Sequence, residues 1–263
     1  VPVYVQLLGG QPDVLADNAA RAAELGAPGI DLNFGCPAKT VNRSDGGAII
    51  LREPERVFAI TAAVRRTVPA DIPVTVKTRL GYEDHSLFLD IVRGVEAAHA
   101  SELTVHARTK RHGYRPPAYW EEIALARETV SLPVIANGEI WSADDALRCR
   151  QISGCEDLML GRGALCRPDL PRLVAAANRH ESRESLHWPD ITPLLWKFFE
   201  LNLQHYDAGH AGNPLKQWLV YLRSYFPQAA LLFERVKRLR QPDDIRVVLR
   251  QALSADQPSL WVA

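Results

Sequence analysis

Gly29-Ile30-Asp31-Leu32-Asn33-Phe34-Gly35-Cys36-Pro37 is the stretch that decides the fold of this 263-residue chain. Its apolar first half predicts a buried β-strand, which Gly35 and Pro37 end. Asn33 and Cys36 then lie at the C-terminal end of the strand, where folds built from parallel strands and helices carry their chemistry. A lone cysteine is more often a buried structural residue. Position alone therefore leaves both roles of Cys36 open.

The same unit, an apolar strand followed by a helical segment, recurs along residues 1–187. Five more strands are predicted at residues 3–8, 74–80, 103–106, 133–138 and 157–163. Strand and helix alternate at intervals of roughly 25 to 45 residues, which is typical of parallel βαβ units. Every strand ends in polar or glycine-rich residues. We therefore predict an α/β fold, a (β/α)8 TIM-type barrel with its site on the C-terminal face.

The number of strands bears on this prediction, because six βα units are present and a closed barrel of this type has eight. We expect a barrel that lacks its first two strands, in a chain that opens on Val1 rather than Met. An open, doubly wound sheet is the alternative. It is less favoured because no Gly-x-Gly-x-x-Gly follows the first strand.

The composition changes at Trp188, after which helical, aromatic-rich runs replace the strand pattern. We therefore predict two domains, the barrel at residues 1–187 and a helical domain at 188–263. Leu215, Trp218, Leu219 and Leu222 form one apolar stripe. Lys216 and Arg223 lie off this stripe, on a face that meets either solvent or a polyanion.

Charge and cysteine content narrow the possible partners and the compartment. The formal net charge is zero, so any nucleic-acid surface must be a local patch. The longest apolar runs are too short to cross a bilayer, and no signal-peptide pattern opens the chain. The four cysteines show neither metal spacing nor a disulfide framework. We expect a cytoplasmic protein without a metal site, and no obligatory protein partner is evident.

Two cationic features stand at strand ends. Lys77 interrupts an apolar strand, and a lysine there needs a polar or negative partner such as a bound cofactor. His106 ends the next strand and opens a loop with Arg108, Lys110, Arg111 and Arg115, together with Tyr114. This loop suits phosphates and a stacked base. A packed lysine stem and a flexible charged loop are the structural alternatives.

The last two predicted strands end in Asn137-Gly138 and Gly161-Arg162-Gly163. Glycine there lets backbone N–H groups reach a ligand phosphate, and the dipole of the following helix adds to the attraction. In TIM-type barrels the phosphate site commonly lies after strands seven and eight. If two strands are missing at the front, the last two predicted strands of this chain correspond to strands seven and eight of the barrel.

Taken together, the motifs resemble those of the tRNA-dihydrouridine synthases. Six pieces match in family order: Val5-Gln6-Leu7, Asp31-Leu32-Asn33-Phe34-Gly35-Cys36-Pro37, Val76-Lys77-Thr78-Arg79, His106-Ala107-Arg108-Thr109, Ala136-Asn137-Gly138-Glu139 and Gly161-Arg162-Gly163-Ala164. The segments Pro37-Ala38-Lys39-Thr40-Val41-Asn42 and Leu215-Lys216-Gln217-Trp218-Leu219 resemble the bacterial C-type branch. The family's earlier strand, with a flavin-contacting Pro-Met-type segment, has no counterpart here.

The resemblance implies an FMN-bound barrel followed by a helical tRNA-binding domain. The implied reaction is reduction of the C5–C6 bond of a D-loop uridine in tRNA, with NADPH as the source of electrons. The resemblance makes Cys36 the general acid that protonates C5. The residues implied to bind FMN are Gln6, Lys77, His106, Asn137, Gly138, Glu139, Gly161 and Arg162. The resemblance also implies that Asn33 and Tyr114 face the RNA substrate, and the local basic patches add Arg108, Lys216 and Arg223 to the predicted RNA contacts.

Two other functions stay open at the level of sequence. One is a different FMN barrel oxidoreductase that acts on a free pyrimidine, which would need neither the basic loop nor the aromatic-rich tail. The other is a catalytically impaired RNA-binding remnant, which the short front of the barrel would explain.

Overall fold

The structure, a computed structural model, describes residues 2–255. Their strands are β1 (Val5–Leu7), β2 (Ile30–Asn33), β3 (Val74–Arg79), β4 (Glu102–His106), β5 (Val134–Asn137) and β6 (Leu158–Met159). The helices between them are α1 (Pro12–Glu24), α2 (Lys39–Arg43), the 3₁₀ helix η1 (Gly47–Arg52), α3 (Pro54–Thr67), α4 (Phe88–Ala97), α5 (Trp120–Thr129) and α6 (Ala143–Ser153). After β6 come α7 (Arg162–Cys166), α8 (Leu170–Asn178), α9 (Trp188–His205), α10 (Gly212–Leu222), α11 (Pro227–Val236) and α12 (Pro242–Ala255).

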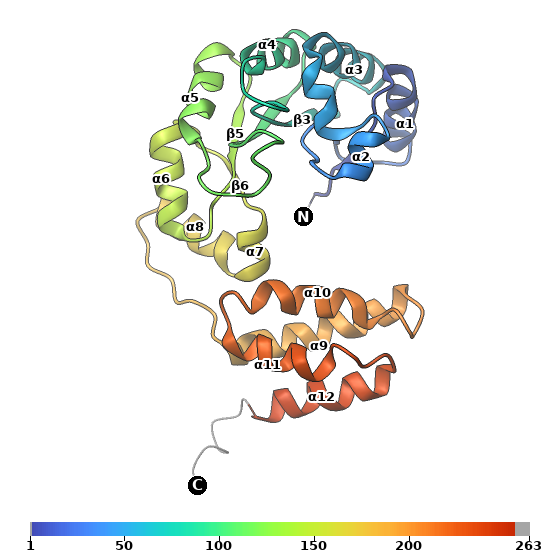
Figure 1. Cartoon of the computed structure of the whole chain (residues 1–263), viewed down its shortest axis with the longest axis vertical. Helices are drawn as coiled ribbons and strands as arrows, with labels where there is room; N and C mark the ends of the chain where they lie inside the picture. The colour runs from blue at the N-terminus through green and yellow to red at the C-terminus, as the bar shows by residue number, and fades with distance from the viewer. Residues whose placement is uncertain (1, 256–263) are drawn as a thin grey trace. The chain divides into compact units, whose positions relative to one another are not determined.

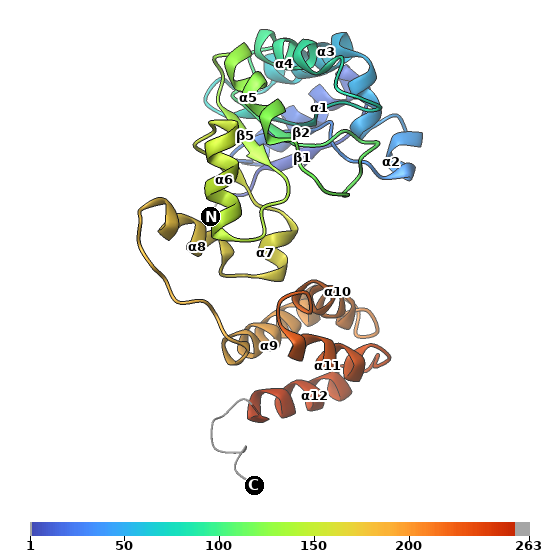
Figure 2. The same ribbon diagram turned by 60° about the vertical axis from the view of Figure 1, so that its left-hand side comes forward.

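The six strands form one parallel sheet in the order of the sequence, β1-β2-β3-β4-β5-β6. This arrangement confirms the predicted α/β class, with each strand followed by at least one helix. Figures 1 and 2 show α1, α3, α4 and α5 along one side of the strands. Neighbouring helices of this layer pack on one another, α1 on α3, α3 on α4 and α4 on α5. The sheet therefore has one face covered by helices and one face left for polar side chains.

Alternation along the strands assigns side chains to these two faces. In β2, Ile30 and Leu32 are fully buried, while Asp31 and Asn33 keep part of their surface exposed. The register pairs Ile30 with Val74 and Asn33 with Lys77. Because paired residues of a parallel sheet point to the same side, the valine packs with the isoleucine and the lysine shares a face with Asn33.

Proline and glycine stand at the ends of the first helices. Pro12 and Pro54 occupy the first helical turn of α1 and α3, where the missing N–H costs no hydrogen bond. Gly26 follows α1 with φ +86°, a left-handed conformation that favours glycine.

The sixth strand is shorter than the prediction of residues 157–163. Its pairing with β5 ends at Asn137 and Met159, where Asn137 Nδ2 donates to the Met159 carbonyl at 2.7 Å. Helix α7 begins at Arg162. Gly161-Arg162-Gly163 is therefore the start of a helix rather than the end of a strand.

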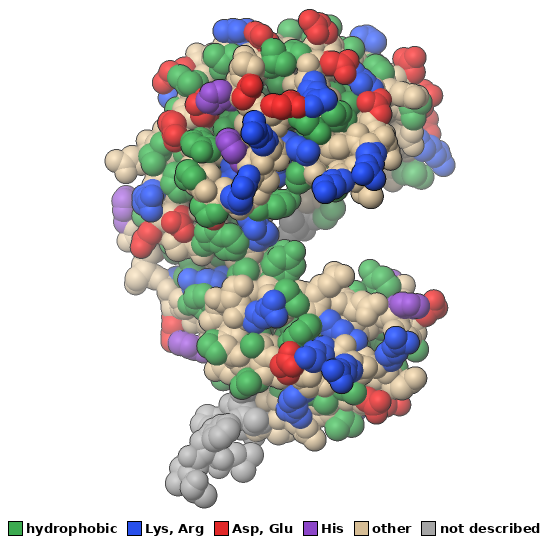
Figure 3. All heavy atoms as spheres, in the orientation of Figure 1, with side chains coloured by type: hydrophobic (Ala, Val, Ile, Leu, Met, Phe, Trp, Pro, Cys, Tyr) green, Lys and Arg blue, Asp and Glu red, His purple; other side chains and the backbone are tan. Residues whose placement is uncertain are grey.

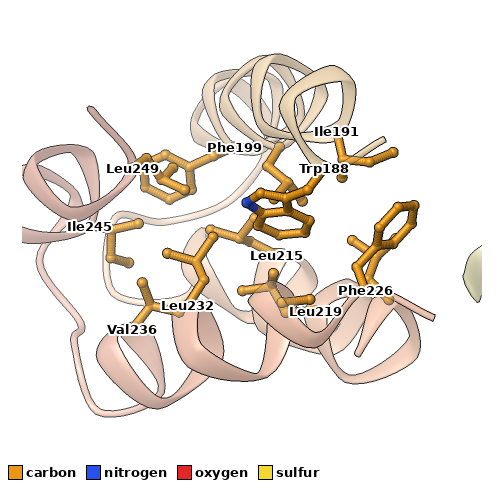
Figure 4. Packing of buried hydrophobic residues seen from close by; sticks show 13 residues of the cluster. Trp188, Ile191, Phe199, Leu215, Leu219, Phe226, Leu232, Val236, Ile245 and Leu249 are labelled. Carbon is orange, nitrogen blue, oxygen red and sulfur yellow. The ribbon is translucent and has the colours of Figure 1, made fainter. Parts of the chain in front are cut away.

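Helices α9 to α12 share one hydrophobic core, drawn in Figure 4. The buried side chains include Trp188, Ile191 and Phe199 from α9, with Leu215 and Leu219 from α10. The apolar stripe predicted in α10 faces this core, although Trp218 is only partly buried. No helix within residues 2–255 is long and apolar enough to span a membrane.

The chain separates into two compact units earlier than the sequence predicted. One unit runs to Ile140 and includes Asp144–Leu160, while the other contains Trp141–Ala143 and everything from Gly161 onward. Helix α7 packs on α10 within the second unit, where Trp218 Nε1 donates to the Leu165 carbonyl at 3.1 Å. For this reason α7 and α8 belong to the same unit as the later helices. The boundary predicted from the sequence, between residues 187 and 188, assigns them to the barrel instead.

Candidate active site

Polar side chains on the open face of the sheet form a hydrogen-bonded chain across β1, β2 and β3. Gln6 Nε2 donates to Asp31 Oδ2 at 2.6 Å, and Thr75 Oγ1 donates to the other carboxylate oxygen at 2.8 Å. Asn33 Nδ2 donates to Gln6 Oε1 at 2.9 Å. The predicted residues Gln6 and Asn33 are thus brought together and held in one orientation.

The loop that carries Cys36 is fixed from the strand before it. Asn33 Oδ1 accepts the backbone N–H of Gly35 at 3.0 Å and that of Cys36 at 2.9 Å. Both ends of the Asn33 amide are therefore in use, one on Gln6 and one on this turn. The geometry supports a positioning role for Asn33 in addition to the RNA contact that the resemblance implies.

The far side of the Cys36 loop rests on the segment after α2. The Cys36 carbonyl accepts the Ala48 N–H at 3.0 Å and Asn42 Nδ2 at 2.9 Å. Gly47 adopts φ +67°, and a Cβ there would lie 2.8 Å from the Cys36 oxygen. Only glycine fits this position, and the residue Cys36 itself stays partly exposed.

Lys77 lies beside this cluster on β3, and its Nζ donates to Asn137 Oδ1 at 3.0 Å. Within residues 2–255 it forms no ion pair. Burial, together with the charge of Arg79 and against the smaller opposing effect of Asp31, lowers the pKa of Lys77 to about 8. A partly buried ammonium with one neutral acceptor has room for an electron-rich partner.

His106 and Gly138 lie close together at the ends of β4 and β5. His106 is buried and pairs with Asn137 in the sheet register. Gly138 has φ +121°, and a Cβ there would approach the His106 ring to 3.1 Å. The glycine that the sequence assigns to phosphate contact thus also makes room for the histidine.

Arg108 departs from its predicted place in an exposed cationic loop. Its side chain has no exposed surface, and its guanidinium pairs with Glu139 while Nε donates to the Pro117 carbonyl at 2.9 Å. Because the charge is buried and neutralised, Arg108 does not belong to the surface that RNA can reach in this conformation. The pairing also occupies Glu139, which the resemblance assigns to FMN.

The rest of the basic loop is exposed. Tyr114 keeps 53% of its surface and stands 6.2 Å from the His106 ring, centroid to centroid. Arg111 and Arg115 line a hollow of about 440 Å³ with His112. Burial lowers the pKa of His112, and the positive charges of Arg115, Arg108 and Arg111 lower it further. Glu83 and Asp84 also line this hollow, so its charges are mixed, and the exposed Arg111 and Arg115 are the side chains there that can meet an anion.

Figure 3 shows Lys and Arg side chains over this loop and over α2. On α2, Lys39 and Arg43 are exposed and lie within seven residues of Cys36 in the chain. Lys39 appeared in the sequence analysis only as part of the segment that resembles the C-type branch. The signal for both residues was the presence of two basic residues soon after the cysteine.

Arg79 is a second residue that sequence reasoning passed over. It is only 3% exposed, yet it donates to carbonyl groups of both the Cys36 loop and the Tyr114 loop. Its signal in the sequence was the same as that of Lys77, a cation inside an apolar strand.

Four predicted residues, Gly161, Arg162, Lys216 and Arg223, belong to the second unit. Arg162 lies over the Trp141 ring at 5.1 Å, and a Cβ on Gly161 would meet no atom within 4 Å. Lys216 Nζ donates to the Leu239 carbonyl at 2.6 Å, and burial, with Arg240, lowers its pKa. Arg223 is exposed, with its guanidinium 5.7 Å from the Phe233 ring centroid. Lys216 thus has a structural contact that its predicted RNA role did not include.

The first unit has the donor set that an isoalloxazine ring and its ribityl chain require. Lys77 offers a cation, Gln6 an amide, and Asn137 a side chain already bonded to Lys77. No group of three or more metal-binding side chains gathers within the described part of the chain. The arrangement can hold a planar, electron-rich cofactor on the sheet face, with a partly exposed thiol near it.

Comparison with known proteins agrees with this arrangement. The sequence model of the dihydrouridine synthase family matches residues 1–252. A tRNA-dihydrouridine(16) synthase of Pseudomonas syringae pv. tomato is 51% identical over 94% of this chain and 78% of its own length. One of Shewanella oneidensis is 46% identical over 95% and 78%. Among solved structures, D-glucarate dehydratase of Agrobacterium tumefaciens aligns over 69% of this chain and 46% of its own, with a TM-score of 0.49 and 15% identity, too low to support an argument.

Proposed function

Because the chain belongs to the dihydrouridine synthase family, whose members are oxidoreductases that act on uridine in tRNA, we propose that it reduces uridine 16 of tRNA with bound FMN and NADPH. The relatives named for position 16 support the position. The observation that supports the chemistry best is the pairing of a partly buried cation, Lys77, with Asn33, the residue that orients the Cys36 loop.

The cofactor site in this proposal is the polar face of the sheet. Lys77 would hold the electron-rich pyrimidine edge of the flavin, and Gln6 and Asn137 would hydrogen-bond its ring and ribityl chain. FMN, when bound and reduced by NADPH, would supply hydride for C6 of the uracil. The lowered pKa of Lys77 supports this assignment, because it shows that burial disfavours the ammonium, and an anionic or electron-rich partner would offset that penalty.

Cys36 supplies the proton. Its thiol donates to C5 of the uracil as charge develops there, and solvent then reprotonates the thiolate. Asn33 and Gly47 hold the loop that carries the thiol, one from each side. The uridine has to leave its stack to reach this depth.

RNA contacts in the first unit come from exposed cations and one aromatic ring. Lys39 and Arg43 follow the Cys36 loop, and Arg111 and Arg115 are exposed on the loop after β4 and line the hollow there. Tyr114, the exposed ring nearest His106, offers a stacking surface. Arg223 offers a phosphate contact in the second unit. Lys216 has a structural role there instead, because its ammonium donates a hydrogen bond to the Leu239 carbonyl.

The finer architecture belongs to the same proposal. We infer that β1–β6 form part of a (β/α)8 barrel, which the sequential parallel order and the polar strand ends support. The helices with their own core form the tRNA-binding part, and the cytoplasm, where tRNA is modified, is the proposed location.

The test uses purified protein reconstituted with FMN. Unmodified tRNA transcripts are incubated with NADPH, and dihydrouridine is mapped by position. Dihydrouridine at position 16 is the expected product. Reduction of free uridine without reduction of tRNA would instead favour the free-pyrimidine alternative, and absence of product despite flavin reduction by NADPH would contradict the proposal.

A further inference from the structure

Arg79 stands at the end of β3, two residues beyond Lys77, and connects two loops that come from different strands. Its Nε donates to the Gly35 carbonyl at 2.7 Å, immediately before Cys36. Its Nη1 donates to the Gly113 carbonyl at 2.9 Å and to the Thr109 carbonyl at 3.2 Å. The Tyr114 ring lies 5.3 Å from its guanidinium carbon.

The two loops have different tasks in the function proposed above. The loop after β2 carries the proton donor, and the loop after β4 carries the exposed ring of Tyr114 together with Arg111 and Arg115. A guanidinium is planar, with donors fixed in a fork, so it transmits a displacement of one carbonyl to the others more rigidly than an ammonium would. With 3% of its surface exposed, Arg79 is shielded from competing water.

We propose that Arg79 is a positioning residue that couples the RNA-facing loop to the Cys36 loop. When RNA contacts Tyr114, the loop that carries Tyr114 is held in place. Because the Arg79 guanidinium is hydrogen-bonded to this loop and to the Gly35 carbonyl, it then fixes the Cys36 loop with the thiol placed for proton donation to C5. The proposal rests on the proposed tRNA reduction.

A purely structural role is the competing explanation, and the chain offers a matched control for it. Arg65, on α3, also donates to loop carbonyls, to Ile72 at 2.8 Å and Val68 at 2.7 Å. These carbonyls precede β3, at the opposite end of the strands from Cys36. Arg65→Met therefore removes a comparable clamp without touching either functional loop.

The experiment compares Arg79→Met and Arg65→Met in the FMN-loaded protein. NADPH reduces the flavin anaerobically, and its oxidation by tRNA is followed in single turnovers at increasing tRNA concentration. For Arg79→Met we expect the rate at saturating tRNA to fall about 10- to 100-fold, with half-saturation and flavin reduction unchanged. Arg65→Met should lower only the unfolding midpoint. If both variants lose rate in proportion to their loss of stability, Arg79 is structural and the proposal is overturned.

The coupling itself is tested by a double-mutant cycle. Tyr114→Ala should slow the saturating rate in the wild-type background and add nothing in the Arg79→Met background, because the link is already cut. Additive losses would refute the coupling. If Arg79→Met does not fold, Arg79→Lys replaces it, since one ammonium cannot span both loops in the same geometry.

Hydrogen exchange provides a readout that does not depend on turnover. Peptides covering residues 34–38 and 109–115 should both exchange faster in the Arg79 variant and remain unchanged in Arg65→Met. Faster exchange in one loop alone would overturn the linkage. A wild-type protein whose reduced flavin is not oxidised by tRNA would contradict the proposed function, and the exchange result would still test the linkage separately.

Discussion

Asn33 and Cys36 are joined by a hydrogen bond of 2.9 Å from the Cys36 amide to the Asn33 side-chain oxygen. The last residue of β2 therefore sets the direction in which the Cys36 loop leaves the sheet. The same side chain is anchored on Gln6 of β1, so two strands together define where the thiol lies.

Removing this anchor should loosen the loop before it affects the fold. Asn33→Ala withdraws one acceptor from two backbone N–H groups, at a cost of about 1–3 kcal/mol in the free energy of unfolding. Urea denaturation of the FMN-loaded protein measures it. Asn33→Asp is the matched control, because its carboxylate still accepts both N–H groups. Equal stability of the Ala and Asp variants would contradict the role of the acceptor.

Cys36→Ala separates the two half-reactions. FMN binding and flavin reduction by NADPH should persist, because the thiol acts on uridine. Oxidation of the reduced flavin by tRNA should slow by at least about 100-fold, the effect of losing a general acid. Stopped-flow absorbance measures both steps. Cys149→Ala is the control: burial raises the pKa of that thiol to about 12, so it is an inert core residue. Unchanged tRNA turnover in Cys36→Ala would disprove its role.

Lys77 gives a pH dependence of stability with a defined sign. Its pKa in the folded protein without flavin is about 8, below the value of about 10.4 for an unperturbed lysine. Between these values the unfolded chain binds more protons, so the free energy of unfolding contributed by Lys77 rises with pH. Denaturation of flavin-free protein at several pH values measures the slope, and Lys77→Met should remove this contribution. An identical slope in the variant would refute the lowered pKa.

The buried pair of Arg108 and Glu139 predicts an asymmetric response to mutation. Arg108→Met leaves a carboxylate without its partner and should cost about 3–5 kcal/mol of stability. Glu139→Gln should cost less, since the amide oxygen still accepts from the guanidinium. Chemical denaturation distinguishes them. A loss in Arg108→Met no larger than that of an exposed arginine such as Arg111→Met would mean that the pair is not formed.

Lys216 on α10 and Arg223, which directly follows this helix, should differ in their effect on tRNA binding. Arg223→Ala should reduce the log–log salt slope of tRNA binding by up to about one unit, as expected for one phosphate contact. Lys216→Gln should chiefly lower stability, by about 1 kcal/mol, through loss of the bond to Leu239. Fluorescence anisotropy at several salt concentrations measures the slopes. A larger slope change for Lys216 than for Arg223 would reverse these assignments.

Local patterns predicted the sheet and the place of the cysteine. The apolar run of β2, with glycine and proline behind it, placed Asn33 and Cys36 at a strand end. Burial of Arg108 could not be predicted in this way, because its partner Glu139 lies 31 residues later, in the loop after β5. The start of α7 at Arg162 depends on how far β6 pairs with β5, which the glycines alone do not indicate.

The packing of α7 on α10 determines how this protein responds to proteolysis and where a fragment should begin. Residues 179–184 form an exposed connection, where a protease would cut first. The two fragments would remain associated, because the Trp218 indole donates a hydrogen bond to the Leu165 carbonyl. In addition, the Arg167 guanidinium carbon lies 4.3 Å from the centroid of the Tyr225 ring. A nicked sample would therefore migrate as two bands on a denaturing gel yet elute as one species. An expressible helical fragment should begin at Gly161 rather than Trp188.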